Sequence, residues 1–124
     1  MADKLDTMFD MRLSFMNSLS NLVPDTYTDI PLDLSKKADQ RFCRDIALRG
    51  VEEMFEALQH LKNWKPHRQT EVSDFDKDEF LEEIVDAFNY FFSLLILTGV
   101  DANQLFEAYE KKDKIIHKRL GDGY

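Results

Sequence analysis

The sequence predicts an all-α bundle of four to five helices, formed by residues 1–124 as a single domain. Only 4 glycines and 3 prolines occur in the chain, which leaves few breaks and favours long helices over many short strands. Apolar residues recur at three- and four-residue spacings, the pattern of amphipathic helices. Hydrophobic residues make up 44% of the chain, which is enough for a folded core of ordinary domain size.

The charge balance limits the partners of the chain. Its 24 acidic and 16 basic residues give a net charge of −8, which suits cations and opposes nucleic acids and anionic membranes. A single cysteine, Cys43, rules out an internal disulfide and a Cys-rich zinc site. The longest apolar run, residues 91–100, is far shorter than the roughly 20 residues that span a bilayer. We expect a cytoplasmic protein without a nucleic-acid or membrane partner.

The first two helices are predicted by apolar spacing and by their ends. A helix over about residues 3–22 is followed by a loop with two prolines. Ser35 is the predicted N-cap of a second helix, over about residues 36–63. Pro66 disfavours helix at the preceding residue and is expected to end the second helix.

The third helix is expected to begin near Ser73 or Asp74 and to run to about residue 98. Acidic residues in its first turns suit a helix N-terminus. Its second half is apolar almost all round, which predicts burial on more than one side and favours a subunit interface. Gly99 then fits the position after a helix, and Asp101 fits the N-cap of a fourth helix over about residues 102–120. The apolar contacts of the fourth helix are expected from Leu105, Phe106, Tyr109, Ile115 and Ile116.

Two pairs of carboxylates are the first candidate site. Glu53 and Glu56 are three residues apart in the second helix, and Glu83 and Asp86 are three apart in the third. Residues at this spacing share a helix face. Four carboxylates brought together repel one another unless a hard cation such as Mg²⁺ binds between them. The alternative interpretation is a solvated acidic face, which an acidic chain produces by chance.

A basic segment near the C-terminus is the second candidate. Lys112 and Arg119 are seven residues apart and lie on one helix face, where they suit phosphate binding. The alternative is that cations there only complement the helix dipole. Trp64, in the segment HLKNWK, is read first as a residue that covers the core and second as a stacking surface.

The stretch EEIVDAFNYFFSLLILTGVDANQLFEAYEKKDKIIHKRLGDGY resembles the C-terminal half of the all-α dUTPases, the dimeric dUTPase and phage dCTPase-dUTPase group. That group is related to the MazG-like nucleoside triphosphate pyrophosphohydrolases. HLKNWK is similar to the lysine–tryptophan segment that follows the first acidic motif of the family, and LDTMFDMRLSF is similar to its first helix. The matching positions are Glu83, Asp86, Phe88, Tyr90, Phe91, Gly99, Tyr109, Lys112, Arg119, Gly123 and Tyr124.

The resemblance implies cleavage of the α–β bond of a deoxynucleoside triphosphate, with dUTP or dCTP as the substrate, by a homodimer or tetramer. It implies that Mg²⁺, with Mn²⁺ as a substitute, binds Glu83 and Asp86 together with a first acidic motif, for which Glu53 and Glu56 are the candidates. One of these two glutamates would act on the attacking water. The implied phosphate ligands are Lys112, Arg119, Tyr124 and Lys65, and the candidates for the base or sugar pocket are Asn89, Trp64 and Arg12.

The sequence departs from the family pattern at three places. Counted back from Lys62 and Trp64, the second glutamate of the first motif falls on Glu53 and the first falls on Gly50. Either the motif is displaced to Glu53 and Glu56, or the metal shell is incomplete and Glu52 or another acid compensates. An asparagine of the last motif is Ile116 here, and a glutamine of the first helix is Arg12.

Three functions therefore compete. The first is a Mg²⁺-dependent pyrophosphohydrolase of dUTP or dCTP, which acts in the cytoplasm, or in the host cytoplasm if the chain is phage-encoded. The second is a non-catalytic nucleotide-binding or helical interaction protein that keeps the fold with an incomplete metal site, and Gly50 favours it. The third is a structural bundle with solvated acidic faces, for which neither Mg²⁺ nor nucleotide should have an effect.

Overall fold

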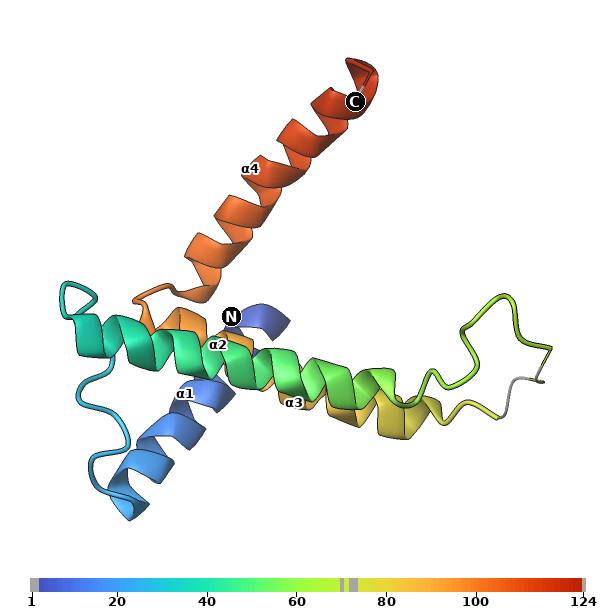
Figure 1. Cartoon of the computed structure of the whole chain (residues 1–124). Helices are drawn as coiled ribbons and strands as arrows, with labels where there is room; N and C mark the ends of the chain where they lie inside the picture. The colour runs from blue at the N-terminus through green and yellow to red at the C-terminus, as the bar shows by residue number, and fades with distance from the viewer. Residues whose placement is uncertain (1–2, 70, 72–73, 124) are drawn as a thin grey trace. The chain divides into compact units, whose positions relative to one another are not determined.

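The computed structural model describes residues 3–69, 71 and 74–123. Within these residues the secondary structure is entirely helical, which confirms the predicted all-α class. The helices are α1 (Lys4–Leu22), α2 (Lys37–Leu58), α3 (Lys77–Leu97) and α4 (Ala102–Gly121) (Figure 1). The chain divides into two compact units: unit 1 comprises Met1–Leu32 and Leu95–Tyr124, and unit 2 comprises Asp33–Leu94.

Unit 2 is an antiparallel pair formed by α2 and the greater part of α3. Gly50 of α2 lies against the ring of Phe91 in α3. Towards the other end of the pair, the rings of His60 and Phe80 lie edge to face, with centroids 6.5 Å apart. Because residue numbers rise along α2 and fall along α3 between these contacts, the two helices run in opposite directions. The buried hydrophobic residues of unit 2 are Cys43, Ile46, Ala57 and Ala87.

Unit 1 contains α1, the last residues of α3, and α4, and α1 contacts α4. The backbone N–H of Leu32 donates to the carbonyl of Leu97 at 2.8 Å, and this hydrogen bond connects the loop after α1 to the end of α3. Gly99 has a φ of 82°, a conformation that glycine adopts without strain. Asp101 and Gln104 form a reciprocal capping box at the start of α4. The predicted roles of Gly99 and Asp101 are confirmed.

Three predicted helix ends were wrong. Lys36, not Ser35, occupies the N-cap of α2 and makes no side-chain capping bond there, because the Ser35 hydroxyl donates to Asp33 Oδ1 at 2.6 Å instead. The second helix ends at Leu58 rather than near residue 63, since the next two backbone N–H groups bond to carbonyls only three residues back.

The third helix begins at Lys77, where Asp76 Oδ1 accepts the N–H of Glu79 at 3.1 Å. A short polar side chain that receives this N–H at the start of a helix stabilises it as an N-cap does. Ser73, one of the two predicted starting points, lies outside the described residues. Asp74, the other, precedes the helix.

The two apolar helices of the C-terminal half differ in burial. From Asn89 to Thr98 no residue is exposed, as the all-round apolar pattern predicts. In α4 only Ala102 is buried and Leu105 half-buried, whereas Phe106, Tyr109, Ile115 and Ile116 are exposed. The prediction that these four residues supply packing contacts is wrong for the single chain, in which they cover no core.

The described helices are of moderate length and polarity. None of them is, by itself, both long enough and apolar enough to cross a bilayer. Only α3 and α4 taken together, with the bend between them, meet the criteria of length and composition.

Candidate active site

Three carboxylates from two helices converge in unit 2. Glu53 and Glu56 of α2 and Glu83 of α3 each place a carboxylate oxygen within 4.8 Å of the others. We call these three residues the acidic cluster. The antiparallel pairing of α2 and α3 brings them together, because residues three apart share one face of α2 and that face borders α3. Carboxylate oxygens at this spacing are a fitting donor set for a hard divalent cation.

The surroundings of the acidic cluster disfavour the ionised form of Glu53. The pKa of Glu53 is raised above its ordinary value of 4.5, first by burial and then by the negative charge of Glu56. A hydrogen bond shared with Glu56 and the charges of Asp86 and Glu83 raise the pKa further. Since a divalent cation would cancel this repulsion, the acidic cluster fits a metal on grounds of charge as well as geometry.

Asp86 lies at the edge of the acidic cluster. Its charge acts on Glu53, but Asp86 is exposed and its oxygens are not among those that converge. Glu52 is also exposed and lies outside the cluster. The structure therefore brings together Glu53, Glu56 and Glu83, with Asp86 nearby, and it leaves Glu52 outside.

Gly50 has a structural reason to lack a side chain. It is buried, and a Cβ atom built there would lie 2.8 Å from Cε1 and 3.0 Å from Cζ of Phe91. Such distances are shorter than packed carbon atoms tolerate, so α2 and α3 approach closely only because residue 50 is glycine. No carboxylate fits at position 50 unless Phe91 moves, so a ligand that replaces the missing glutamate has to come from another position.

The connector after α2 gathers cations around an exposed indole. Lys62, Asn63, Trp64, Lys65 and Arg68 line a hollow of about 340 Å³. Lys65 Nζ lies 5.6 Å from the centre of the Trp64 ring, within the range of a cation–π contact. The backbone N–H of Arg68 donates to the carbonyl of Lys65 at 3.3 Å, which closes the turn containing Pro66.

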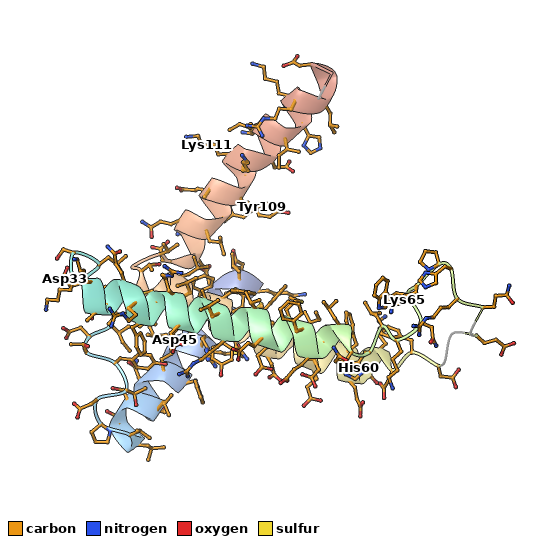
Figure 2. The ribbon with its side chains drawn as sticks, in the orientation of Figure 1. Asp33, Asp45, His60, Lys65, Tyr109 and Lys111 are labelled. Atoms are coloured by element: carbon orange, nitrogen blue, oxygen red, sulfur yellow. The ribbon has the colours of Figure 1, made fainter. Side chains whose placement is uncertain are left out.

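Trp64 is 70% exposed, so the interpretation of this residue as a cover for the core was wrong. The exposed ring is a surface on which a planar ligand can stack. Sequence reasoning missed Arg68, although Pro66 signalled the turn that brings this residue beside Lys65. Figure 2 shows the side chains of His60 and Lys65, which lie at and beyond the C-terminal end of α2.

The other predicted site residues lie as follows. Asn89 is half-buried in α3. Arg12 of α1 lies with its guanidinium carbon 4.6 Å from the centre of the Phe15 ring. Lys112 and Arg119 are exposed on α4 of unit 1, the helix on which Figure 2 labels Tyr109 and Lys111. Tyr124, a predicted phosphate ligand, lies outside the described residues.

Cys43 is not prepared for nucleophilic chemistry. The thiol is buried in unit 2, and burial, followed by the negative charge of Asp39, raises its pKa. A raised pKa keeps the sulfur protonated at neutral pH, and the thiol is a weak nucleophile compared with the thiolate. The carboxylates of unit 2 are therefore its better candidates for chemistry.

Comparison with known proteins gives one informative similarity. No family model matches the chain, and no solved structure matches it. The chain is 26% identical over 129 residues to a dCTP pyrophosphatase of Enterobacteria phage T4, a match that covers 98% of this chain and 67% of the phage protein. Nearly the whole chain therefore aligns with a protein named for hydrolysis of a deoxynucleoside triphosphate.

Proposed function

We propose that the chain, as one all-α catalytic domain, is a pyrophosphohydrolase that cleaves a deoxynucleoside triphosphate to the monophosphate and pyrophosphate. The observation that carries the proposal is the convergence of Glu53, Glu56 and Glu83 from two antiparallel helices. Similarity to a phage dCTP pyrophosphatase supports it independently. The proposed substrates are dCTP and dUTP, and the proposed setting is the cytoplasm, of the host cell if the chain is phage-encoded.

The proposed metal ligands are the acidic cluster and Asp86. Mg²⁺, or Mn²⁺ in its place, supplies neutralisation of phosphate charge and activation of a water when it is bound. Carboxylates suit such ions because Mg²⁺ prefers oxygen ligands. Burial and then the neighbouring carboxylates raise the pKa of Glu53, and a bound cation would offset the repulsion among these carboxylates.

The proposed chemistry of the side chains follows from their types. Glu53 or Glu56 orients the attacking water and accepts its proton as the new oxygen–phosphorus bond forms. The bond between the α-phosphorus and the bridging oxygen breaks, and pyrophosphate leaves with that oxygen. Lys112 and Arg119 are proposed to bind phosphate oxygens through charge-assisted hydrogen bonds, as is Lys65.

Recognition of the nucleoside is proposed for Trp64, Asn89 and Arg12, with Tyr124 as a further phosphate ligand. The exposed Trp64 ring and the cations beside it support this assignment, because a nucleotide combines a planar base with negative charge. We also propose that Arg68 takes part, since it lines the same hollow as Lys62 and Lys65.

A homodimer or tetramer is the proposed assembly. Exposed apolar residues follow the spacing of one helix face in α2, at Val51, Phe55 and Leu58, and in α3, at Leu81, Val85 and Phe88. Apolar stripes of this kind on a soluble chain are typical of subunit interfaces. Light scattering coupled to size-exclusion chromatography measures the mass, and a monomer at micromolar concentration would contradict this part of the proposal.

The experiment that tests the function is pyrophosphate release from a panel of deoxynucleoside and nucleoside triphosphates, with Mg²⁺ and with a chelator. Release from dCTP or dUTP that depends on Mg²⁺ is the expected result. Nucleotide-dependent thermal stabilisation in Mg²⁺ without any product would instead identify a binding protein. If neither product nor stabilisation occurs with the folded protein, both nucleotide functions are wrong.

A further inference from the structure

A second charged surface lies on the first half of α2, and it has the opposite sign. Lys37, Arg41 and Arg44 occupy positions four and three residues apart, so their side chains share one face of the helix. Together with Gln40, Asp45 and Leu48 they line a hollow of about 420 Å³. We call this hollow the cationic groove. Figure 2 labels Asp45 on α2 and Asp33 before its first turn, which mark the region.

The cations of the groove have no acidic partner among the described residues. Asp45 is the groove's own carboxylate, and it pairs with Arg49 at 3.1 Å. Asp39, the acid of the first turn, is buried and accepts the backbone N–H of Asp33 at 3.0 Å. The amide of Gln40 donates to the carbonyl of Leu34 at 2.7 Å. The donors left in the groove are therefore those of Lys37, Arg41 and Arg44.

Lys37 is unfavourably placed in the helix that carries it. The N-terminal turns of a helix carry partial positive charge and favour acids. Lys36 is at the N-cap without a side-chain bond, and Lys37 is the first residue of the helix. Lys37, Arg41 and Arg44 repel one another along this face, and Lys37 also lies at the positive end of the helix dipole. A bound anion would reduce the repulsion among the three cations and would interact favourably with the positive end of the helix dipole.

The composition of the groove selects among anionic ligands. Four of the six residues that line the groove are charged, whereas charged residues are depleted in the cores of protein–protein interfaces. A long nucleic acid would extend beyond the three cations onto a chain that is acidic overall, which opposes its binding. A compact anion needs only the three cations, which lie within two turns of α2.

We propose that the cationic groove binds the phosphate chain of a compact di- or triphosphate, through Lys37, Arg41 and Arg44. Arginine provides paired N–H donors that match phosphate oxygens, and lysine adds a point charge. The phosphate chain can belong to free inorganic polyphosphate or to a nucleotide. The groove is built by α2 alone and uses none of the acidic cluster, so binding there needs no divalent cation.

The test is calorimetric titration of the full chain with inorganic tripolyphosphate and, separately, with dCTP, in a chelator and at low ionic strength. We expect the double variant Arg41→Ala/Arg44→Ala to bind tripolyphosphate at least about tenfold more weakly, the scale of a lost charge-assisted contact. The matched control is Lys111→Ala/Lys114→Ala, which removes the same charge from exposed positions of α4 and should keep the affinity within about twofold. Circular dichroism checks that each variant stays helical.

One comparison, of tripolyphosphate with dCTP, identifies the source of the phosphate chain. A second, of the wild type with Glu83→Gln, distinguishes the cationic groove from the acidic cluster. Equal affinity for tripolyphosphate and dCTP assigns recognition to the phosphate chain alone, and tighter binding of dCTP adds the nucleoside to the site. Binding in the chelator should persist in Glu83→Gln, which disables only the acidic cluster. If Glu83→Gln loses hydrolysis but still binds tripolyphosphate, the result bears on the proposed function of the acidic cluster. The proposal for the cationic groove then stands.

Three results would overturn the inference. The first is the absence of tripolyphosphate binding by the folded wild-type chain at millimolar ligand. The second is an equal loss of affinity in the α4 control, which would show only an effect of net charge. The third is displacement of tripolyphosphate by a single-stranded oligonucleotide at a lower concentration of phosphate groups, which would assign the groove to nucleic acid.

Discussion

The two halves of α2 differ in the sign of their net charge, positive in the first half and negative in the second. Lys37, Arg41 and Arg44 outnumber Asp39 and Asp45 in the first half, whereas Glu52, Glu53 and Glu56 outnumber Arg49 in the second. Helix dipoles favour the reverse arrangement at both ends. The ligands proposed above match this difference, with a cation at the acidic half and an anion at the cationic half.

The halves differ in what surrounds them. The acidic half includes half-buried Glu53 and borders α3, where Gly50 and Phe91 are in close contact. Lys37, Arg41 and Arg44 of the cationic half are exposed. Burial strengthens electrostatic interactions and makes a change in side-chain volume more destabilising, whereas exposure to solvent weakens both effects. Substitutions in the acidic half should therefore have larger consequences than substitutions in the cationic half.

The largest expected effect is on turnover. Glu83→Gln removes one carboxylate of the acidic cluster while keeping nearly the same shape, so pyrophosphate release should fall on the order of 10³-fold with helicity unchanged. Asp86→Asn should act in the same direction. Glu82→Gln, at an exposed position of the same helix, is the matched control and should retain activity. Equal activity of Glu83→Gln and wild type would remove the acidic cluster from the mechanism.

The next effect is on packing beside the acidic cluster. Gly50→Ala adds a methyl group 2.8 Å from a ring carbon of Phe91, and the overpacking should lower the free energy of unfolding by about 1–3 kcal/mol. Gly121→Ala is the control, because nothing lies within 4 Å of its added Cβ, and helix propensity alone should make it neutral or slightly stabilising. Urea denaturation measures both. A gain in stability for Gly50→Ala would show that the helices separate without cost.

A smaller effect is expected at the start of the cationic half. Lys36→Asp provides the side-chain cap that Lys36 lacks and places a negative charge at the positive end of the helix dipole. The unfolding free energy should rise by about 0.5–1 kcal/mol. Lys36→Ala separates the two causes, because it removes the cation without adding a cap. Thermal unfolding in moderate salt is the measurement, and a loss of stability in Lys36→Asp would contradict it.

The smallest effect concerns the pH dependence of the metal-free chain. Because the folded-state pKa of Glu53 is raised above 4.5, the folded state holds this proton more tightly than the unfolded state. The contribution of Glu53 to stability therefore falls as the pH rises from the ordinary pKa through the raised one. Solvent screening of a half-exposed carboxylate keeps the change small.

The comparison that isolates Glu53 is wild type against Glu53→Gln in a chelator across this pH range. The variant should be the more stable chain at neutral pH, and the difference should disappear towards acid. Mg²⁺ should reverse the order at neutral pH, since only the wild type keeps the full set of carboxylates. A difference that does not change with pH would assign the effect to packing instead.

Local patterns in the sequence were sufficient for the helices and for several of their ends. The capping residue Asp101 and the positive φ of Gly99 depend on neighbours within four residues, and such signals are readable without a tertiary structure. Ser35 and the end of α2 were predicted wrongly because competing local bonds decide them: the hydroxyl of Ser35 bonds to Asp33. Nothing in the spacing of residues distinguishes these alternatives.

The candidate site was less accessible from sequence. The spacing of Glu53 and Glu56 indicates a shared face, but the convergence of Glu83 depends on the register of α2 against α3, which the Gly50–Phe91 contact sets. The cationic groove was missed because its cations lie at ordinary helical spacings, and only the structure shows that the nearby acids Asp39 and Asp45 are already engaged.

The contact between Gly50 and Phe91 also constrains how the chain can change. An acidic residue at position 50 becomes tolerable only after the aromatic ring at position 91 is reduced, so the order of substitutions matters. Gly50→Glu should be harmful alone and much less so in a Phe91→Ala background, which is non-additivity in magnitude between two contacting residues. Phenylalanine at position 91 therefore restricts position 50 to the smallest side chains as long as the two helices keep their spacing.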